Sequence, residues 1–321
     1  FISTSIMAGI FLVLTAISGF WFGSIVDHNK KKHAMLGSSA ITLLFFIAGF
    51  LIYSFTPASA FTTVGNPMFW IFIIVLLVGT LIGTIYHISV PTLIPLIVPE
   101  ENIAKANGMF GTTIGVSFAL TSVFSGISLA FGGMSFVLSA SIIVTIIAII
   151  VLSFIKIPEK EVIHVHGEKP VDKGIDIKGT IKIISSVSGL FALIFFTTFN
   201  NFLGGVFFAL MDAYGLTLVS VQTWGFLWGV LSFSFIFGGI YIAKKGLSNN
   251  PLRILFRNNI ITWTVCIFFA IQPSIILLAI GTLIWMFFVP FTEAIEQTIL
   301  QKVVPQERLG RVIGFAHSIE Q

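Results

Sequence analysis

Residues 135–155 read SFVLSASIIVTIIAIIVLSFI, a run of 21 residues without a charged side chain. An α-helix rises about 1.5 Å per residue, so a run of this length can cross the hydrocarbon core of a bilayer, which is about 30 Å thick. The apolar residues follow one another without alternation, whereas the strands of a membrane barrel alternate in segments of about 10 residues. The stretch therefore predicts a membrane-spanning helix.

Eight further segments have the same character. Apolar residues make up 56% of the chain and charged residues only 9%, where a soluble domain carries about 25%. A water-soluble fold could not hide that much apolar surface. We predict an all-α, polytopic membrane protein with nine complete transmembrane helices, at 1–26, 34–55, 69–97, 108–131, 135–155, 187–211, 219–243, 254–271 and 274–300.

The basic residues mark alternate connections between these segments. All 17 Lys and Arg lie in, or at the edge of, every second connection. By the positive-inside rule these connections are cytoplasmic, and the strict alternation supports the number of segments. The net charge of +4 is thus explained by membrane topology, and we expect no nucleic-acid partner. The single Cys266 excludes an internal disulfide.

An internal repeat divides the chain into two halves. Residues 98–108 (VPEENIAKANG) resemble residues 304–314 (VPQERLGRVIG) at an offset of 206. We expect an N-terminal bundle at 1–157 (helices 2–6), a polar cytoplasmic linker at 158–186, and a C-terminal bundle at 187–321 (helices 7–10 and the start of helix 11). Copies with the same helix direction indicate parallel repeats. By this count one helix precedes Phe1, and most of helices 11 and 12 lie beyond the end.

Residues 23–32 (GSIVDHNKKK) resemble the signature loop of the major facilitator superfamily, Gly-x-Leu-Ala-Asp-Arg-x-Gly-Arg-Arg. Gly23, Asp27, Lys31 and Lys32 match by type, while His28 stands in place of the usual Arg. The two Val-Pro loops are similar to those of macrolide-efflux and related drug:proton antiporters. The resemblance implies two pseudo-symmetric bundles, alternating access, and a cytoplasmic gate formed by the four matching residues. For Lys31 and Lys32 the alternative is a role in topology.

One departure from the antiporter pattern leaves the transport direction open. Such antiporters usually carry a Gly-Pro pair in helix 5, and Thr121 and Ser122 occupy that place here. The leading hypothesis is proton-coupled efflux of small amphipathic compounds. The alternatives are an importer or symporter of a small metabolite, and a membrane receptor or scaffold that does not transport.

Three titratable side chains lie within the predicted spans: His87, Glu293 and Glu296. Such groups are costly in a bilayer and mark ion or substrate paths. The offset of 206 carries His87 onto Glu293, so we expect both at one depth, as a proton-coupling or substrate-contacting pair. Histidine titrates near neutrality, and desolvation raises a buried glutamate toward that range. Alternatively, His87 bonds a neighbouring helix and the glutamates reach the cytoplasmic surface.

Polar amides supply the remaining candidates for the substrate or proton path. Asn200 and Asn201 interrupt an apolar helix, where interhelical hydrogen bonding and a cavity-facing position are both possible. Gln297 is one turn from Glu293 and could share its face.

The sequence contains no phosphate-binding loop, no His-Glu-x-x-His and no Gly-x-Ser-x-Gly pattern. We therefore expect no enzyme, no cofactor and no metal site, although His164-x-His166 in the linker is a weak metal candidate. The expected partners are a small-molecule substrate and the lipid bilayer. We expect a monomer in the plasma membrane.

Overall fold

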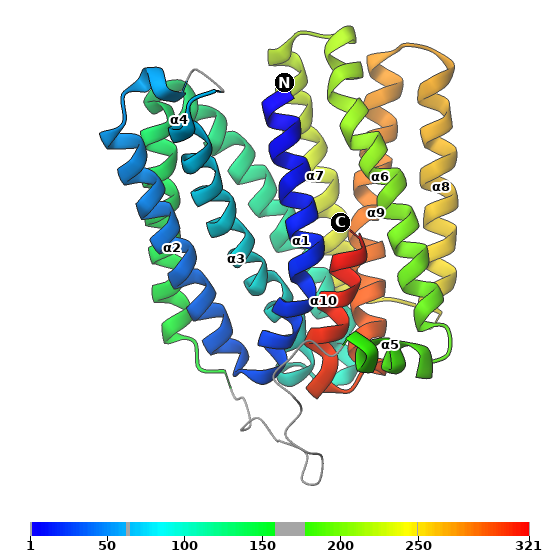
Figure 1. Cartoon of the computed structure of the whole chain (residues 1–321). Coiled ribbons are helices and arrows are strands. Elements are labelled where there is room, and N and C mark those ends of the chain that lie inside the picture. The colour runs from blue at the N-terminus through cyan, green and yellow to red at the C-terminus, as the bar shows by residue number, and fades with distance from the viewer. Residues whose placement is uncertain (1, 62–64, 158–176, 249, 321) are drawn as a thin grey trace. The chain divides into compact units, whose positions relative to one another are not determined.

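The computed structural model describes residues 2–61, 65–157, 177–248 and 250–320 (Figure 1). Its elements in chain order are α1 (Ile2–His28), α2 (Lys31–Phe55), η1 (Ala58–Phe61), α3 (Pro67–Ile97), η2 (Glu100–Asn102), α4 (Ile103–Phe154), α5 (Ile177–Ser186), α6 (Leu190–Leu218), α7 (Val221–Lys245), α8 (Pro251–Ile271), α9 (Ile275–Val303), η3 (Gln306–Arg308) and α10 (Leu309–Glu320). The prediction of an all-α fold is confirmed for these residues.

Each predicted span coincides with helical residues, and two of them are joined in α4. They meet at Gly133, whose φ of 60° and ψ of −162° belong to a region that glycine alone enters easily. Within the described residues, six helices are long and apolar enough to cross a membrane, or seven if the bent pair α5–α6 counts as one span. Several spans are thus established, and the number of nine stays a prediction.

The chain forms two compact units that interleave in sequence. The first unit comprises Phe1–Ile97, Ile127–Thr198 and Val304–Gln321, and the second comprises Val98–Gly126 and Phe199–Val303. Each unit contains helices from both predicted halves of the chain, since α10 belongs to the first unit and the start of α4 to the second. The halves themselves rest on the sequence repeat and stay a prediction. Most of the predicted linker, residues 158–176, lies outside the described residues.

In the first unit, α1 packs along α10 and α3, and α2 packs along α3. The start of α2 is held to the end of α4 by a cluster in which Met35, Leu93 and Leu152 are buried together. The short helix α5 is bent by 107° from α6. These contacts fix the end of α1 where the signature loop begins.

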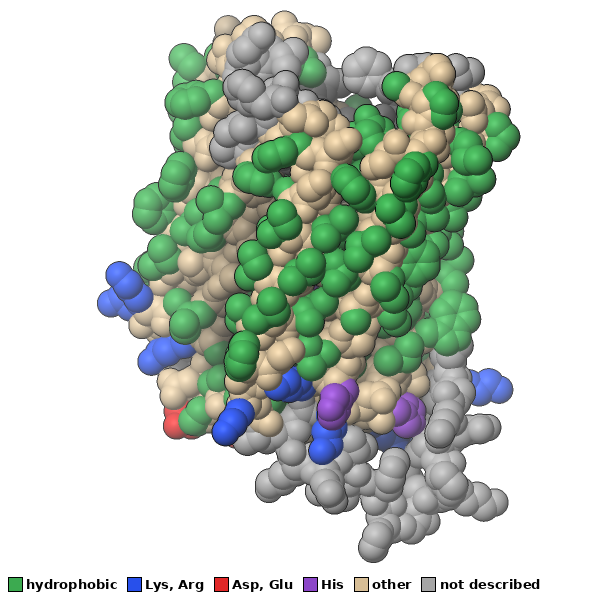
Figure 2. All heavy atoms as spheres, turned by 90° about the vertical axis from the view of Figure 1, so that its left-hand side faces the viewer, with side chains coloured by type: hydrophobic (Ala, Val, Ile, Leu, Met, Phe, Trp, Pro, Cys, Tyr) green, Lys and Arg blue, Asp and Glu red, His purple; other side chains and the backbone are tan. Residues whose placement is uncertain are grey.

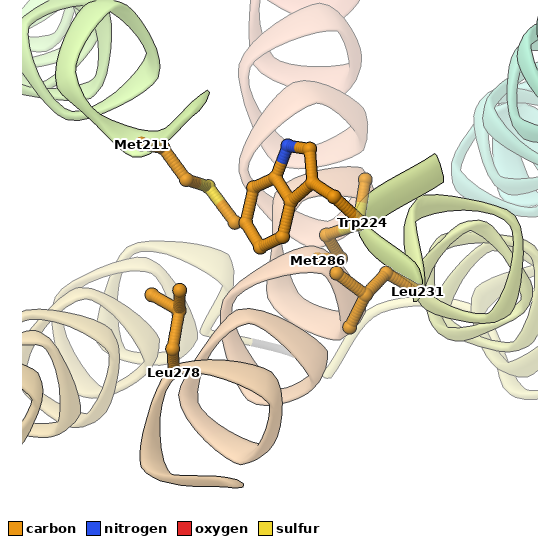
Figure 3. Close-up of a cluster of buried hydrophobic side chains, with 5 residues drawn as sticks. All are labelled: Met211, Trp224, Leu231, Leu278 and Met286. Carbon is orange, nitrogen blue, oxygen red and sulfur yellow. The ribbon is translucent and has the colours of Figure 1, made fainter. Parts of the chain in front are cut away.

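The second unit has a core of large flexible and aromatic side chains. Trp224 and Leu231 of α7 meet Met211 of α6 and Leu278 and Met286 of α9, and their side chains point toward one another (Figure 3). All five are at most 5% exposed. Methionine adapts to the irregular space around an indole ring, so this core holds α6, α7 and α9 together.

Large apolar side chains also cover much of the outer surface. Figure 2 shows one face on which hydrophobic side chains extend over most of the height, while Lys, Arg and His lie toward its lower part. Phe55, Phe154 and Phe226 are among the exposed aromatic residues. Water would not tolerate apolar patches of this extent, whereas lipid does. The chain is therefore a multi-pass membrane protein.

Candidate functional site

Glycines bring α1 and α10 into backbone contact within the first unit. A Cβ atom on Gly314 would lie 2.9 Å from the Cα of Gly23 and would collide with the carbonyl oxygen of Gly19. A Cβ atom on Gly23 would collide with the carbonyl oxygen of Gly310. Because neither helix carries a side chain here, Asp27, one turn after Gly23, reaches the first turn of α10.

Asp27 caps α10 with its carboxylate. Its Oδ1 accepts a hydrogen bond from the backbone N–H of Gly310 at 2.7 Å, and its Oδ2 accepts one from the N–H of Arg311 at 2.9 Å. N–H groups in the first turn of a helix have no partner in their own helix, and the helix dipole favours a negative charge there. The side chain is only 2% exposed. The carboxylate therefore ties the end of α1 to the start of α10.

Arg311 and His28 extend this contact. The Nε of Arg311 lies 3.6 Å from Asp27 Oδ2, and its Nη2 lies 3.1 Å from His28 Nε2. His28 Nδ1 lies 2.8 Å from the carbonyl oxygen of Ser24. A carbonyl and a guanidinium can both be satisfied only if Nδ1 carries the proton and donates, while Nε2 accepts. His28 thus joins Asp27 and Arg311 in one hydrogen-bonded group.

The two lysines of the signature hold helix ends. Lys31 is buried, and its Nζ donates to the carbonyl oxygen of Val26 at 2.8 Å. Lys32 Nζ donates to the carbonyl oxygens of Ser153 and Ile155, at 2.8 and 2.7 Å. The last carbonyls of a helix lack partners within it, and a lysine can satisfy them. Lys32 therefore fastens α2 to the end of α4, and a gating role for either lysine stays a prediction.

The titratable candidates are divided between the two units. His87 on α3 is exposed and belongs to the first unit, while Glu293 on α9 is exposed and belongs to the second. Glu296 is buried, at 7% exposure. The pairing of His87 with Glu293 stays a prediction. Gln297 is partly buried, and its Oε1 has no hydrogen-bond partner among the described residues.

The two asparagines of α6 differ in their surroundings. The Oδ1 of Asn200 accepts a hydrogen bond from Trp263 Nε1 at 2.8 Å, so this residue makes the interhelical contact to α8 that the sequence left open. Asn201 is exposed. Neighbouring helical residues point about 100° apart, which explains why only one of them meets α8.

Sequence reasoning missed a buried amide group in the second unit. Asn107 of α4 donates to Thr298 and Gln301 of α9, with all three side chains at most 6% exposed. It also missed His317, a titratable side chain of α10 in the first unit. Isolated polar residues in apolar helices were the available signal. His164 and His166, the weak metal candidates, lie outside the described residues.

Comparison with known proteins identifies the class. The family model of the Major Facilitator Superfamily matches residues 1–321, and the chain belongs to this superfamily. The family resemblance expected from the signature loop is confirmed. A transporter, and no enzyme, is the kind of protein that this family and fold support.

The individual proteins that the chain resembles share only a small part of its sequence. Macrolide efflux protein A of Streptococcus pyogenes is 24% identical over 324 residues, which cover 95% of this chain and 73% of the relative. The solved structure of the human organic anion transporter MFSD10 (TETRAN) matches with a TM-score of 0.72 at 12% identity, covering 98% of this chain and 74% of that one. The proton:xylose symporter XylE matches with a TM-score of 0.70 at 14% identity, covering 98% and 75%. The structural matches establish the fold.

Proposed function

We propose that the chain forms a proton-coupled transporter of the plasma membrane that exports small amphipathic compounds by alternating access. Membership in a transporter superfamily supports transport, and the macrolide-efflux relative supports export over import. In such transporters two bundles rock against each other around a central substrate site. The basic connections are taken as cytoplasmic on the positive-inside rule.

The observation that carries this proposal is the capping of α10 by Asp27. The two helices belong to different predicted halves of the chain, and the bond joins their predicted cytoplasmic ends. Opening the cytoplasmic side must therefore separate the carboxylate from the N–H groups of Gly310 and Arg311. A bond made in one state alone stabilises that state, so Asp27 favours the state closed to the cytoplasm.

We assign proton coupling to the titratable groups of α3 and α9, His87 and Glu293, with Glu296 as a further candidate. Asn201 and Gln297 are candidate substrate contacts, because polar groups within a span are commonly directed at a pathway. The unpaired Gln297 Oε1 supports this assignment.

The test is accumulation of radiolabelled erythromycin, a macrolide, in cells that express the full chain. We expect severalfold lower accumulation than in control cells, and we expect a proton uncoupler to abolish the difference. His87→Ala and Glu293→Gln variants should retain export but lose the wild-type dependence on external pH.

Each alternative has its own outcome in this assay. Accumulation above control that collapses with the uncoupler would support a symporter. Export that survives the uncoupler would rule out proton coupling. No difference for erythromycin, and none for a panel of cationic and neutral amphipathic drugs, would contradict the export proposal.

A further inference from the structure

We propose that Asn107, Thr298 and Gln301 form a second latch, which holds α4 against α9 and must open during each transport cycle. We call these three residues the amide latch. The inference rests on the proposed alternating access and adds positioning residues to it. None of the three residues belongs to the signature loop.

The hydrogen bonds of the amide latch are reciprocal. Asn107 Nδ2 donates to Thr298 Oγ1 at 2.9 Å and to Gln301 Oε1 at 2.8 Å. Gln301 Nε2 in turn donates to Asn107 Oδ1 at 3.3 Å. Both donors and the acceptor of the Asn107 amide are therefore used. Asn107 is 3% exposed and Gln301 is 5% exposed, so water does not compete for these bonds.

The latch lies near the predicted cytoplasmic ends of both helices. Asn107 is in the second turn of α4, and Gln301 is in the last turn of α9. A salt bridge between Glu100 and Lys302, with 3.8 Å between the charged atoms, lies just outside it. Both of these side chains are well exposed, so the ion pair contributes little. The buried amides are the contact whose loss is costly.

The two helices come from different predicted halves of the chain. The start of α4 belongs to the N-terminal half, and α9 belongs to the C-terminal half. Alternating access moves the halves relative to each other, so an opening at this end separates Asn107 from Gln301. Buried polar groups that lose their partners before water arrives raise the energy of the intermediate. The latch therefore slows opening as well as favouring the closed state.

The repeat shows that the two latches are chemically different. The offset of 206 carries Asn107 onto Ile313, so the second repeat has no amide at the corresponding place of α10. Instead, the carboxylate of Asp27, which belongs to α1, accepts a hydrogen bond from the first turn of α10. One unit is thus closed by a charged group at a helix end and the other by neutral amides between helix sides.

The test uses a cysteine placed inside the amide latch. In a Cys266→Ser background, Thr298→Cys provides a thiol that N-ethylmaleimide reaches only when α4 and α9 separate. Thr298→Cys already replaces one partner of Asn107, so Asn107→Ala in this background removes the two hydrogen bonds with Gln301. It should raise the alkylation rate in proteoliposomes about tenfold. This readout needs no substrate, so it is independent of whether the protein exports erythromycin.

Asn259→Ala is the matched control. Asn259 is also a buried asparagine, but its Nδ2 donates to the carbonyl oxygen of Leu255 in its own helix. Its loss should leave the alkylation rate of the introduced thiol unchanged. An unchanged rate in Asn107→Ala, or an equal increase in Asn259→Ala, would overturn the latch.

A cross-link tests whether the latch must open. In the Cys266→Ser background, Asn107→Cys and Gln301→Cys can be joined by a short reagent with two thiol-reactive ends. Joining them should stop transport, and a cleavable reagent should allow reduction to restore it. Transport that continues in the cross-linked protein would refute the proposal, while the proposed export function would stand.

Discussion

The buried carboxylate of Asp27 is stable because its environment supplies donors. Burying a charge without partners is very unfavourable, and here two backbone N–H groups and the Arg311 guanidinium surround it. The backbone donors belong to a helix end, which would otherwise lack partners of its own. Breaking the contact leaves both sides unsatisfied until water enters. The proposed gate therefore rests on a single side chain.

The contacts of His28 explain why a histidine can stand at this position of the signature. The signature pattern usually has Arg at this position, but a second guanidinium beside Arg311 would offer donors where an acceptor is needed. The imidazole Nε2 supplies that acceptor, 3.1 Å from Arg311 Nη2. The histidine that replaces the usual Arg is therefore suited to its partner, the Arg311 guanidinium of α10.

Replacing Asp27 tests the gate at one residue. Asp27→Asn retains one acceptor oxygen but turns an NH2 group toward the N–H donors of α10. Hydrogen bonds to charged groups contribute about 1.5–3 kcal/mol, so the closed state should lose at least tenfold in population. We expect erythromycin export to fall to about a tenth or less at unchanged expression, measured by accumulation in cells.

Asn29→Ala is the control for this variant. Asn29 lies two residues further on and is exposed, and its one hydrogen bond to the described residues goes to the carbonyl oxygen of Ile25, four residues earlier. It should export like the wild type. If Asp27→Asn exports equally well, Asp27 has no gating role.

At the scale of helices, the gate depends on how closely α1 approaches α10. Gly19 and Gly23 face Gly310 and Gly314, so the backbones touch without intervening side chains. The carboxylate of aspartate is short, and it reaches two N–H groups of α10 only at this separation. The small residues therefore set the distance across which the charged group acts.

Gly314→Ala should separate these two helices. Its Cβ would meet backbone atoms of Gly19 and Gly23, which cannot move aside as a side chain would. We expect the thermal unfolding midpoint in detergent, followed by tryptophan fluorescence, to fall by several degrees, and export to fall with it.

Gly37→Ala is the comparison, since no atom lies within 4 Å of the Cβ that it would add to α2. An alanine in a helix interior is favoured over glycine by up to about 1 kcal/mol, so this variant should be as stable as the wild type or more so. Equal losses in both variants would show that close packing of α1 and α10 is not the cause.

Helices and their connections were predictable from sequence because lipid imposes their length and hydrophobicity. The break in α4 falls at Gly133, in the uncharged connection between two predicted spans. Asp27 was predictable because it lies in a short local pattern. Its partner Arg311 was not, since it lies 284 residues away and the contact depends on the rotation of both helices. The same holds for Asn107 and Gln301.

At the scale of the whole molecule, each unit contains one of the two proposed latches. Asp27 acts in the first unit and Asn107 in the second, and each joins helices from both predicted halves of the chain. If the halves move as rigid bodies, both latches must open in the same step. The free energies that the two latches contribute to the closed state then add in one equilibrium between closed and open states.

Combining the two variants tests this coupling. The free energies of mutations at sites with no shared partner add, so their effects on one equilibrium constant multiply. In the Cys266→Ser, Thr298→Cys background, Asp27→Asn should by itself speed alkylation of the introduced thiol, although Asp27 bonds to α10 and not to the residues of the amide latch among the described residues. The double variant Asp27→Asn, Asn107→Ala should then be faster than the wild type by the product of the two single effects. A rate no greater than that of Asn107→Ala alone would mean that the two units open independently. In that case the Asp27 contact would be a local helix cap, and alternating access would depend on the amide latch alone.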